Sequence, residues 1–377
     1  MGGGSVAAQG VAELLGRAVR AGLTVGWVGL VVREGEAGMC WCTGARGVGG
    51  EPVEPDLRYD LASLTKPLAT GTLLLLARRD GLDLDAPLAD LLPELAGAPW
   101  GGVTFLQCAT HTAGFPAWAP LYATHGASRE GYLEALRELA PTAPAGTRVE
   151  YSCPGFIALG FALERAGGAD LATLFADLVA GPLELGEELS FAPPPGIPVA
   201  AGEKRWLVDE RLLAERDLAA VPPSGRIGVI PCGDGNARGL DGVAGNAGLF
   251  GTAAAVARLA AEFLPGGGEL LTAEEAELGT RGRTEGLEQA RGIGWQLAAT
   301  PECSAGTALP SHAFGHTGFS GTSVWVDPDS RTVHVLLGNR LHPGGRTPDL
   351  HPLRRRFHLL SGRALGERAA GTPGDGW

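Results

Sequence analysis

Apolar positions near the start of the chain recur first with helical spacing and then with strand character. Over residues 6–23 they fall three to four positions apart, which predicts a helix. Residues 24–34 and 38–43 are rich in Val, Trp and Cys and are separated by Gly, which predicts two paired strands. The chain is therefore expected to begin with a helix followed by a hairpin.

A second apolar run follows Ser63. Residues 64–78 contain good helix formers, and Pro67 lies near the start of the run, where a helix tolerates proline. This predicts Ser63 at the N-terminus of a helix. From there to about residue 245 the pattern predicts short helices, including 128–139 and 155–167, separated by Pro and Gly loops and without strand alternation.

The pattern changes again after residue 250. A helix is predicted over 252–263, strands over 294–298, 322–326 and 332–337, and a closing helix over 353–360. Strands at both ends with helices between them indicate a discontinuous α/β domain of residues 1–62 and 246–377. Residues 63–245 then form a mainly helical domain, and we expect the site in the cleft between the two.

Composition narrows the partners. A chain of 377 residues with 45% hydrophobic residues can bury a large core, and a net charge of -12 argues against nucleic acid as a partner. A small molecule fits better. The basic run Arg354, Arg355 and Arg356 is expected to be a solvated helix face.

The number of cysteines and the first residues of the chain indicate the cellular compartment in which the protein is expected. Six cysteines in so long a chain are too sparse for a disulfide scaffold, and no pair has zinc-knuckle spacing, so no metal is expected. Cys40 and Cys42 would share one strand face and are expected to be buried thiols. No signal-like segment and no apolar run long enough to span a bilayer is visible, which favours a cytoplasmic protein without membrane contact.

The chain has two lysines, Lys66 and Lys204, among thirty lysines and arginines. Lys66 follows Ser63 by three positions, so on a helix the two side chains share a face. Lysine can release its proton when burial and a nearby cation lower its pKa to about 7, whereas arginine effectively cannot. Ser63 is thus a candidate nucleophile with Lys66 as its base. The alternative is that Ser63 only caps a helix and Lys66 faces solvent.

Two further segments carry candidate chemistry. Tyr151, one of four tyrosines, precedes an apolar helix, and its phenol could act as a second base or as the acid for the leaving group, although an isolated tyrosine is more often a core residue. Residues 314–323 are glycine-rich and indicate a loop or edge strand that a ligand could approach. Within them, His316 could bind a substrate carboxylate near neutral pH, or could be a surface histidine on a turn.

In this order, the three elements resemble those of serine β-lactamases, penicillin-binding proteins and related esterases. Ser63 and Lys66 match the Ser-x-x-Lys box, Tyr151 matches the tyrosine of the Tyr-x-Asn box, and His316, Thr317 and Gly318 match the Lys/His-Thr-Gly box. Residues 104–115, 242–252 and 315–339 also resemble segments of class-C-like members, and the resemblance spans about 25–343.

The resemblance implies an α/β fold with an antiparallel sheet flanked by helices and an inserted, mainly helical lobe. It implies an acyl-enzyme on Ser63 without metal or organic cofactor, and an oxyanion held by the backbone N–H groups of Ser63 and Phe319. The tyrosine in the second box is similar to that of class C enzymes and esterases. Cys153 departs from the family, because it stands where asparagine is usual.

Three classes of function are relevant to these residues. The first is a serine hydrolase of small esters, β-lactams or D-amino-acid amides, with Cys153 biasing it towards esters. The second is a catalytically weak or silent penicillin-binding-protein-like ligand sensor. The third, an α/β-hydrolase, is excluded because no Gly-x-Ser-x-Gly elbow occurs. Substrate identity and oligomeric state are left open by the sequence.

Overall fold

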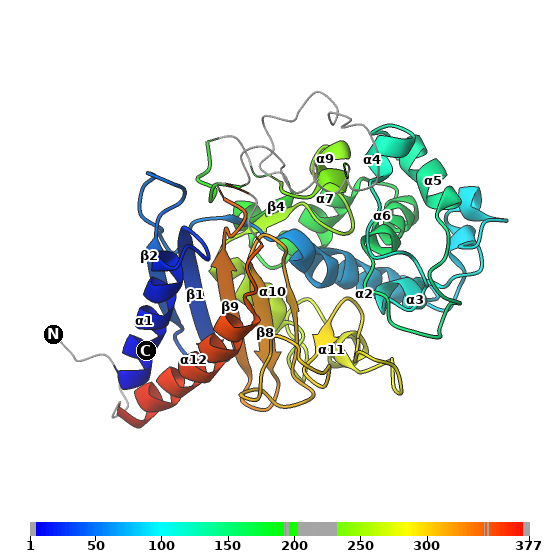
Figure 1. Ribbon diagram of the computed structural model, residues 1–377. Helices are drawn as coiled ribbons and strands as arrows, with labels where there is room; N and C mark the ends of the chain where they lie inside the picture. Colours follow the sequence, from blue (N-terminus) through cyan, green and yellow to red (C-terminus); the bar gives the residue numbers. More distant parts are fainter. Residues whose placement is uncertain are drawn as a thin grey trace.

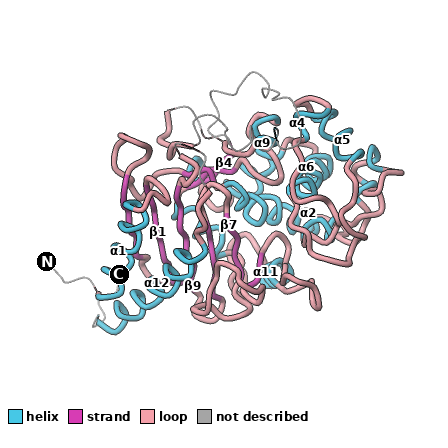
Figure 2. Tube along the Cα trace, in the orientation of Figure 1, coloured by secondary structure: helices cyan, strands magenta, loops and turns pink. Residues whose placement is uncertain are grey.

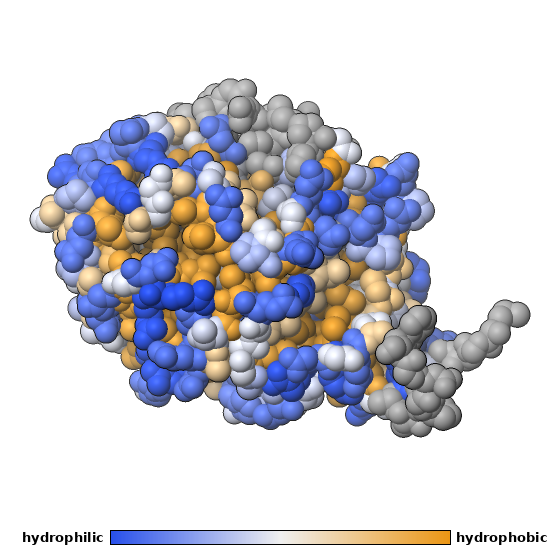
Figure 3. All heavy atoms as spheres, turned by 180° about the vertical axis from the view of Figure 1, so that it is seen from behind, coloured by the Kyte–Doolittle hydropathy of each residue, from blue (hydrophilic) through white to orange (hydrophobic). Residues whose placement is uncertain are grey.

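The computed structural model describes residues 5–191, 193, 196–202, 214, 232–342, 344 and 347–371. The larger group of strands lies in one half of the molecule, and helices joined by long loops fill the other (Figure 2). Apolar residues gather across the middle of the face shown in Figure 3, and hydrophilic residues border them. Lys204 lies outside the described residues. No described helix is both long enough and apolar enough to cross a membrane.

The large sheet has six antiparallel strands in the order β2-β1-β9-β8-β7-β6. Strands β1 and β9 are paired in a register that places Leu30 opposite Val335. Their residues are largely buried on both faces, which explains their nearly continuous apolar sequences. The strand bounds are β1 Gly26–Arg33, β2 Met39–Gly44, β6 Gln296–Leu297, β7 Phe314–Thr317, β8 Ser323–Asp327 and β9 Thr332–Gly338.

Helices cover the two faces of this sheet (Figure 1). On one face Trp27 and Leu336 pack with Phe357, in a cluster formed with α1 (Val6–Arg20) and α12 (His351–Gly371). On the other face Val28 and Val335 belong to the main core together with α10 (Ala253–Ala261). Successive strand residues therefore alternate between the two helical layers.

The other half contains the remaining helices and a small second sheet of order β3-β5-β4. That sheet joins the segment just before Ser63 to distant parts of the chain, because β3 pairs with β5. The bounds are β3 Tyr59–Asp60, β4 Leu189–Phe191, β5 Leu249–Gly251, α2 Thr72–Arg79, α3 Phe105–Ala109, α4 Leu121–Thr124, α5 Arg129–Glu138, α6 Cys153–Gly167, α7 Leu171–Phe175, α9 Gly235–Gly239 and α11 Ala273–Thr280.

Local capping explains where several predicted helices begin. The hydroxyls of Ser128, Ser152 and Thr252 accept backbone N–H bonds in the first turns of α5, α6 and α10. Gly168, with a φ of 68°, ends α6 in the left-handed conformation that glycine adopts without strain. The predicted first helix, the hairpin, the helices near 128–139, 155–167 and 252–263, and the strands near 322–326 and 332–337 are confirmed with small shifts of their ends.

The predicted continuous helix after Ser63 is wrong in detail. Ser63 lies in a 3₁₀ turn, Ala62–Leu64, followed by a π-helical turn, Lys66–Gly71, before α2 begins. Pro67 has no N–H to donate, so the regular hydrogen-bond ladder cannot run through this turn. The Thr72 hydroxyl donates to the Pro67 carbonyl at 3.3 Å.

Three other expectations are corrected. The strand expected over 294–298 shortens to β6. Of residues 314–323, residues 314–317 form β7, an inner strand between β6 and β8 and not an edge, while residues 318–322 form the expected loop. Cys40 and Cys42 are exposed, because Trp41 faces α1 and donates to the Ala8 carbonyl while the thiols face outwards. Arg354 is buried, because α12 lies against the sheet and this guanidinium donates to the Thr322 carbonyl at 2.9 Å.

Candidate active site

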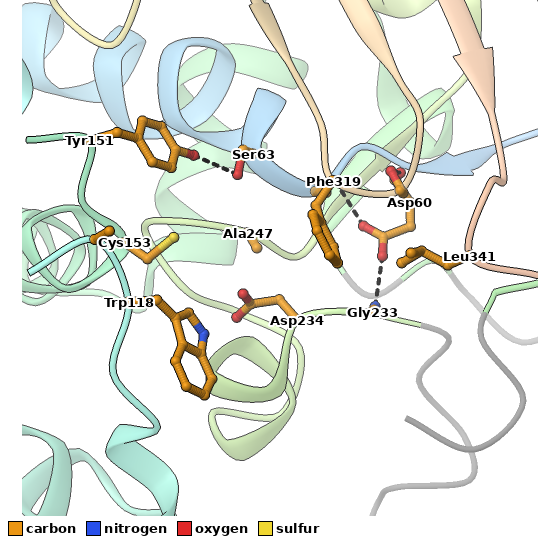
Figure 4. Close-up of a pocket in the computed structure, with 13 residues that line it drawn as sticks. Asp60, Ser63, Trp118, Tyr151, Cys153, Gly233, Asp234, Ala247, Phe319 and Leu341 are labelled. Atoms are coloured by element: carbon orange, nitrogen blue, oxygen red, sulfur yellow. Dashed lines mark hydrogen bonds between the residues drawn. The ribbon is translucent and has the colours of Figure 1, made fainter. Parts of the chain in front are cut away.

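Ser63 lies between two proton-carrying groups (Figure 4). The Tyr151 hydroxyl donates to Ser63 Oγ at 2.7 Å, and Lys66 Nζ donates to the same oxygen at 3.0 Å. Ala62, just before the serine, has a φ of +47°. This left-handed conformation is energetically unfavourable for any residue with a Cβ. The structure therefore brings together the three residues that the sequence nominated, on a strained turn that presents the hydroxyl.

Lys66 is completely buried. Its ammonium group has three acceptors, which are Ser63 Oγ, the Asn246 carbonyl at 3.1 Å and Cys153 Sγ at 3.5 Å. Burial lowers the pKa of Lys66, but electrostatic interaction with Cys153 and Tyr151 outweighs it, so the pKa lies above its usual value. The expectation of a lowered lysine pKa is wrong, because three acceptors surround the ammonium group where a cation was expected.

Tyr151 is held by a histidine that the sequence analysis did not single out. The His111 ring lies 4.7 Å from the Tyr151 ring, and its Nδ1 accepts the Ser152 N–H at 3.0 Å. The His111 carbonyl accepts the Glu150 N–H, so both neighbours of Tyr151 are fixed. Burial raises the pKa of Tyr151, which keeps its phenol protonated in the resting site.

Cys153 begins α6 and lies within reach of Lys66 Nζ, as its place in the second box implies. Burial raises the pKa of this thiol from its usual value, although Lys66 pulls it the other way. The position therefore offers the lysine a neutral thiol, which is a weaker acceptor than an amide oxygen.

The turn between β7 and β8 clamps the segment before Ser63. The Ser320 hydroxyl donates to the Asp60 carbonyl at 2.6 Å, and the Thr322 hydroxyl donates to the Leu61 carbonyl at 3.1 Å. A Cβ at Gly318 would lie 2.6 Å from the Leu61 oxygen, so the two backbones approach as only glycine permits. Phe319, 44% exposed, stands beside Ser63 at the wall of the cavities described below.

His316 is buried, contrary to its expected role as a titrating cation. Burial, with the positive charges of Arg291 and Lys66, lowers the pKa of His316 well below 6.5. Its Nδ1 lies 2.9 Å from the Thr317 carbonyl, which it contacts as a neutral ring. The imidazole is therefore uncharged near neutrality and cannot supply the positive charge that a lysine would give there.

Asp60 ties the serine turn to a distant segment. Its carboxylate accepts the N–H of Ala62 at 2.8 Å and that of Gly233 at 2.7 Å (Figure 4). Burial raises the pKa of Asp60 to about 6, although these two hydrogen bonds lower it. Nothing in the local sequence marks this aspartate, because its partners lie two residues away on one side and far along the chain on the other.

Two cavities meet at Ser63, Tyr151 and Phe319. The first, of about 290 Å³, is lined mostly by small and apolar side chains. Those of Trp118, Ala247 and Leu341 are its apolar walls, with Cys153 beside Ser63 and Asp234 at the side of Trp118 (Figure 4). The second, of about 370 Å³, extends past His316 and Thr317 and carries most of the charge near the site.

The charge in the second cavity is mainly positive. Arg291 and Arg354 are buried there, and Arg340 also lines the cavity. Asp349 is the carboxylate in the cavity lining. Burial lowers the pKa of Arg291 to about 10 and that of Arg354 to about 9, and both remain cations at neutral pH. Among the described residues neither has an ion-pair partner within 4.0 Å. Sequence analysis missed Arg291, which lies in no recognisable motif, and wrongly placed Arg354 on a solvated helix face.

Comparison with known proteins gives consistent matches. The family model described as Beta-lactamase matches residues 15–358. The curated relative Esterase EstB of Burkholderia gladioli is 30% identical over 369 residues, covering 88% of this chain and 90% of the relative. Two solved structures show the same fold. One is a class C beta-lactamase from Rhodobacter sphaeroides, with TM-score 0.71, 21% identity and coverage of 95% and 99%. The other is D-alanine carboxypeptidase AmpC from Burkholderia cenocepacia, with TM-score 0.69, 20% identity and coverage of 94% and 99%.

Proposed function

The chain belongs to the Beta-lactamase family of serine hydrolases, and on that premise we propose that it works through an acyl-enzyme on Ser63 and prefers small esters. One observation carries the proposal: Ser63 Oγ lies 2.7 Å from the Tyr151 hydroxyl and 3.0 Å from Lys66 Nζ. A serine hydroxyl in contact with two groups that exchange protons is the arrangement that nucleophilic catalysis requires.

In the proposed reaction the reacting form of the site is the one in which the Lys66–Tyr151 pair has already released one proton to solvent. Ser63 Oγ then bonds to the substrate carbonyl carbon while its own proton passes to that pair. The carbonyl oxygen becomes an oxyanion, held by the backbone N–H groups of Ser63 and Phe319. The bond to the leaving group then breaks, and the pair returns the proton to that group. Water attacks the resulting ester by the same route, releasing the acid and restoring the serine.

The two cavities suggest how a substrate is oriented. The apolar cavity suits a small uncharged acyl group, because its walls include Trp118, Ala247 and Leu341. The cationic cavity suits a carboxylate on the leaving group, because Arg291 and Arg354 can donate charge-assisted hydrogen bonds to it. The proposed substrate is thus a small ester, with a leaving-group carboxylate bound at the arginines where one is present.

Cys153 supports the preference for esters over amides. A thiol is a poor replacement for the amide that usually occupies this position, since it neither donates nor accepts strongly. Each missing hydrogen bond is worth about 0.5 to 1.5 kcal/mol, so β-lactams and peptides that use this contact lose one to two orders of magnitude. Activated esters depend on it less, because their leaving group departs readily.

The test compares kcat/KM for a p-nitrophenyl short-chain ester and a chromogenic cephalosporin, in wild type and in Cys153→Asn. We expect efficient ester turnover, weak cephalosporin turnover, and a gain on the cephalosporin in the variant. Efficient cephalosporin turnover by wild type that the substitution leaves unchanged would refute the bias. Peptide mapping after a fluorophosphonate probe should place the label on Ser63, and a label on Ser152 or Ser320 would overturn the assignment.

The arginine assignment has a matched pair of substrates. The butyrate esters of 4-hydroxybenzoate and 4-hydroxybenzamide differ only in the carboxylate of the leaving group. Arg291→Gln should lower kcat/KM for the first by about 10- to 100-fold, the loss of one charge-assisted bond, and affect the second much less. Equal losses on both esters would remove the carboxylate role.

A further inference from the structure

Asn246 carries a buried amide that the catalytic scheme does not use. The residue is 1% exposed, and neither Oδ1 nor Nδ2 has a hydrogen-bond partner among the described residues. Buried amides are normally paired, because leaving one unpaired costs about 1 to 3 kcal/mol. This cost indicates a function of the Asn246 amide in the surrounding active site.

The segment that carries Asn246 is fixed on two sides. The Thr70 hydroxyl donates to the Gly245 carbonyl at 2.7 Å, which ties the segment to the turn that carries Lys66. A Cβ at Gly245 would lie 2.0 Å from the Phe156 oxygen, so the backbone is pressed against α6, the helix that begins at Cys153. The segment that carries Asn246 is therefore held against both the turn that carries Lys66 and the helix that begins at Cys153.

Both neighbours interact with Asn246. Its backbone carbonyl accepts a hydrogen bond from Lys66 Nζ at 3.1 Å. Its side-chain amide lies near the Cys153 sulfur and lowers the thiol pKa, against the larger effect of burial, which raises it. Geometry falls short of a regular hydrogen bond between the amide and the sulfur. Cys153 in turn is the third acceptor of the Lys66 ammonium group, at 3.5 Å.

We propose that Asn246 is a positioning residue for Lys66, supplying from the opposite side of the cysteine the amide that position 153 lacks. The amide restrains the Cys153 sulfur, and the sulfur with the Asn246 carbonyl holds Nζ against Ser63. Asn246 does not touch the substrate; it acts through Lys66. The inference rests on the proposed function, because positioning of Lys66 matters only if Lys66 and Ser63 perform the reaction.

The exchange of the two side chains is the sharpest test. Asn246→Cys should lower kcat for a p-nitrophenyl ester by about 10-fold with little change in KM, because the variant removes the amide that restrains Cys153 and leaves the substrate contacts in place. Adding Cys153→Asn returns an amide to the same space, and the double variant should recover to within about 3-fold of wild type. Wild-type kcat in Asn246→Cys, or no recovery in a folded double variant, overturns the proposal.

A second variant keeps the proposal testable if the double variant with the two side chains exchanged does not fold. Asn246→Asp keeps the size of the side chain and places a carboxylate beside the lysine, which raises the pKa of Lys66. The limb of the pH–rate profile governed by Lys66 should move to higher pH by about one unit. An unmoved limb would mean that the amide does not communicate with Lys66, and the proposal would fail.

Asn236 provides the matched control. It is also fully buried, but its amide is satisfied by the Leu121 N–H and the Ala119 carbonyl. Asn236→Ala should lower Tm without moving the pH–rate limbs. If wild type turns over no ester and Ser63 takes no fluorophosphonate, the proposed function itself fails. If wild type is active and the Asn246 variants match it, only the positioning role fails.

Discussion

Lys66 combines complete burial with a raised pKa, and this combination shapes what its replacement can do. Its three acceptors suit the compact ammonium group, and proton exchange with Ser63 requires a group that can give its proton up. Arginine keeps the charge but carries a larger planar head that effectively never loses its proton.

Lys66→Arg should therefore be nearly as damaging as Lys66→Ala, each lowering kcat by about 10² to 10⁴, the usual contribution of a positioned acid or base. The measurement is ester kcat for the two variants under saturating substrate, with circular dichroism as the folding control. Turnover near wild type in Lys66→Arg would show that only the positive charge is needed.

His316 leads to a pH prediction opposite to the one its sequence position suggests. Because burial and the positive charges of Arg291 and Lys66 hold the pKa of His316 well below 6.5, the ring is neutral throughout pH 6–8. Arg291 and Arg354 remain charged in this range, and in the proposed function they bind the substrate carboxylate instead.

We therefore expect KM for the 4-hydroxybenzoate ester to stay constant between pH 6 and 8, relative to KM for its benzamide counterpart. The two Michaelis constants are measured across that range in one buffer series. A selective rise in KM for the carboxylate ester as pH passes 6.5 would show that an imidazolium takes part after all.

At the scale of elements, the passage from β3 into the serine turn depends on the charge of Asp60. Its carboxylate accepts N–H groups from Ala62 and Gly233, and burial raises its pKa to about 6. A raised acid pKa means that the folded state binds this proton more tightly than the unfolded chain does. Protonation below pH 6 therefore favours the fold slightly, while it removes an acceptor from the turn.

Ester kcat should consequently fall as pH drops through about 6, although global stability does not fall for this reason. In Asp60→Asn the limb near pH 6 should vanish, and kcat should be low at every pH, because the amide presents N–H groups to one of its donors. Pre-steady-state acylation rates in both proteins provide the measurement. Persistence of the limb in Asp60→Asn would assign it to another group.

Elements that are specified by their own local sequence could be predicted, and elements that depend on distant segments could not. α5, α6 and α10 were predictable because a capping hydroxyl and an apolar period mark each one. β3, β4 and β5 were missed because each has only two or three residues and exists through pairing with distant segments. In the site, Ser63 and Lys66 stood out through the scarcity of lysine, whereas Arg291, Arg354 and Asn246 are brought in by the fold alone.

At the scale of the molecule, one core runs through both halves. It connects Val28 and Val335 of the large sheet with Leu73, Phe156 and Leu171 of the helical half. The division into residues 1–62 with 246–377 and residues 63–245 remains a prediction about organisation. A shared core implies that neither part is stable without the other.

Thermal unfolding should accordingly show a single transition, with calorimetric and van't Hoff enthalpies equal within error. Residues 63–245 expressed alone should lack cooperative unfolding, because their apolar surface against the sheet would be exposed. Differential scanning calorimetry of the full chain and of the fragment tests this. Two resolved transitions, or a cooperatively folded fragment, would show that the halves are independent domains.

The left-handed turn at Ala62 implies a trade-off between thermal stability and the rate of acylation. Alanine at a φ of +47° costs about 1 to 2 kcal/mol relative to glycine, so Ala62→Gly should raise Tm. The same change frees the backbone that presents the Ser63 hydroxyl, so the acylation rate should fall. A population screened only for survival at high temperature would accumulate glycine here, and one screened for product would discard it. A variant with both higher Tm and faster acylation would show that the strain does not serve catalysis.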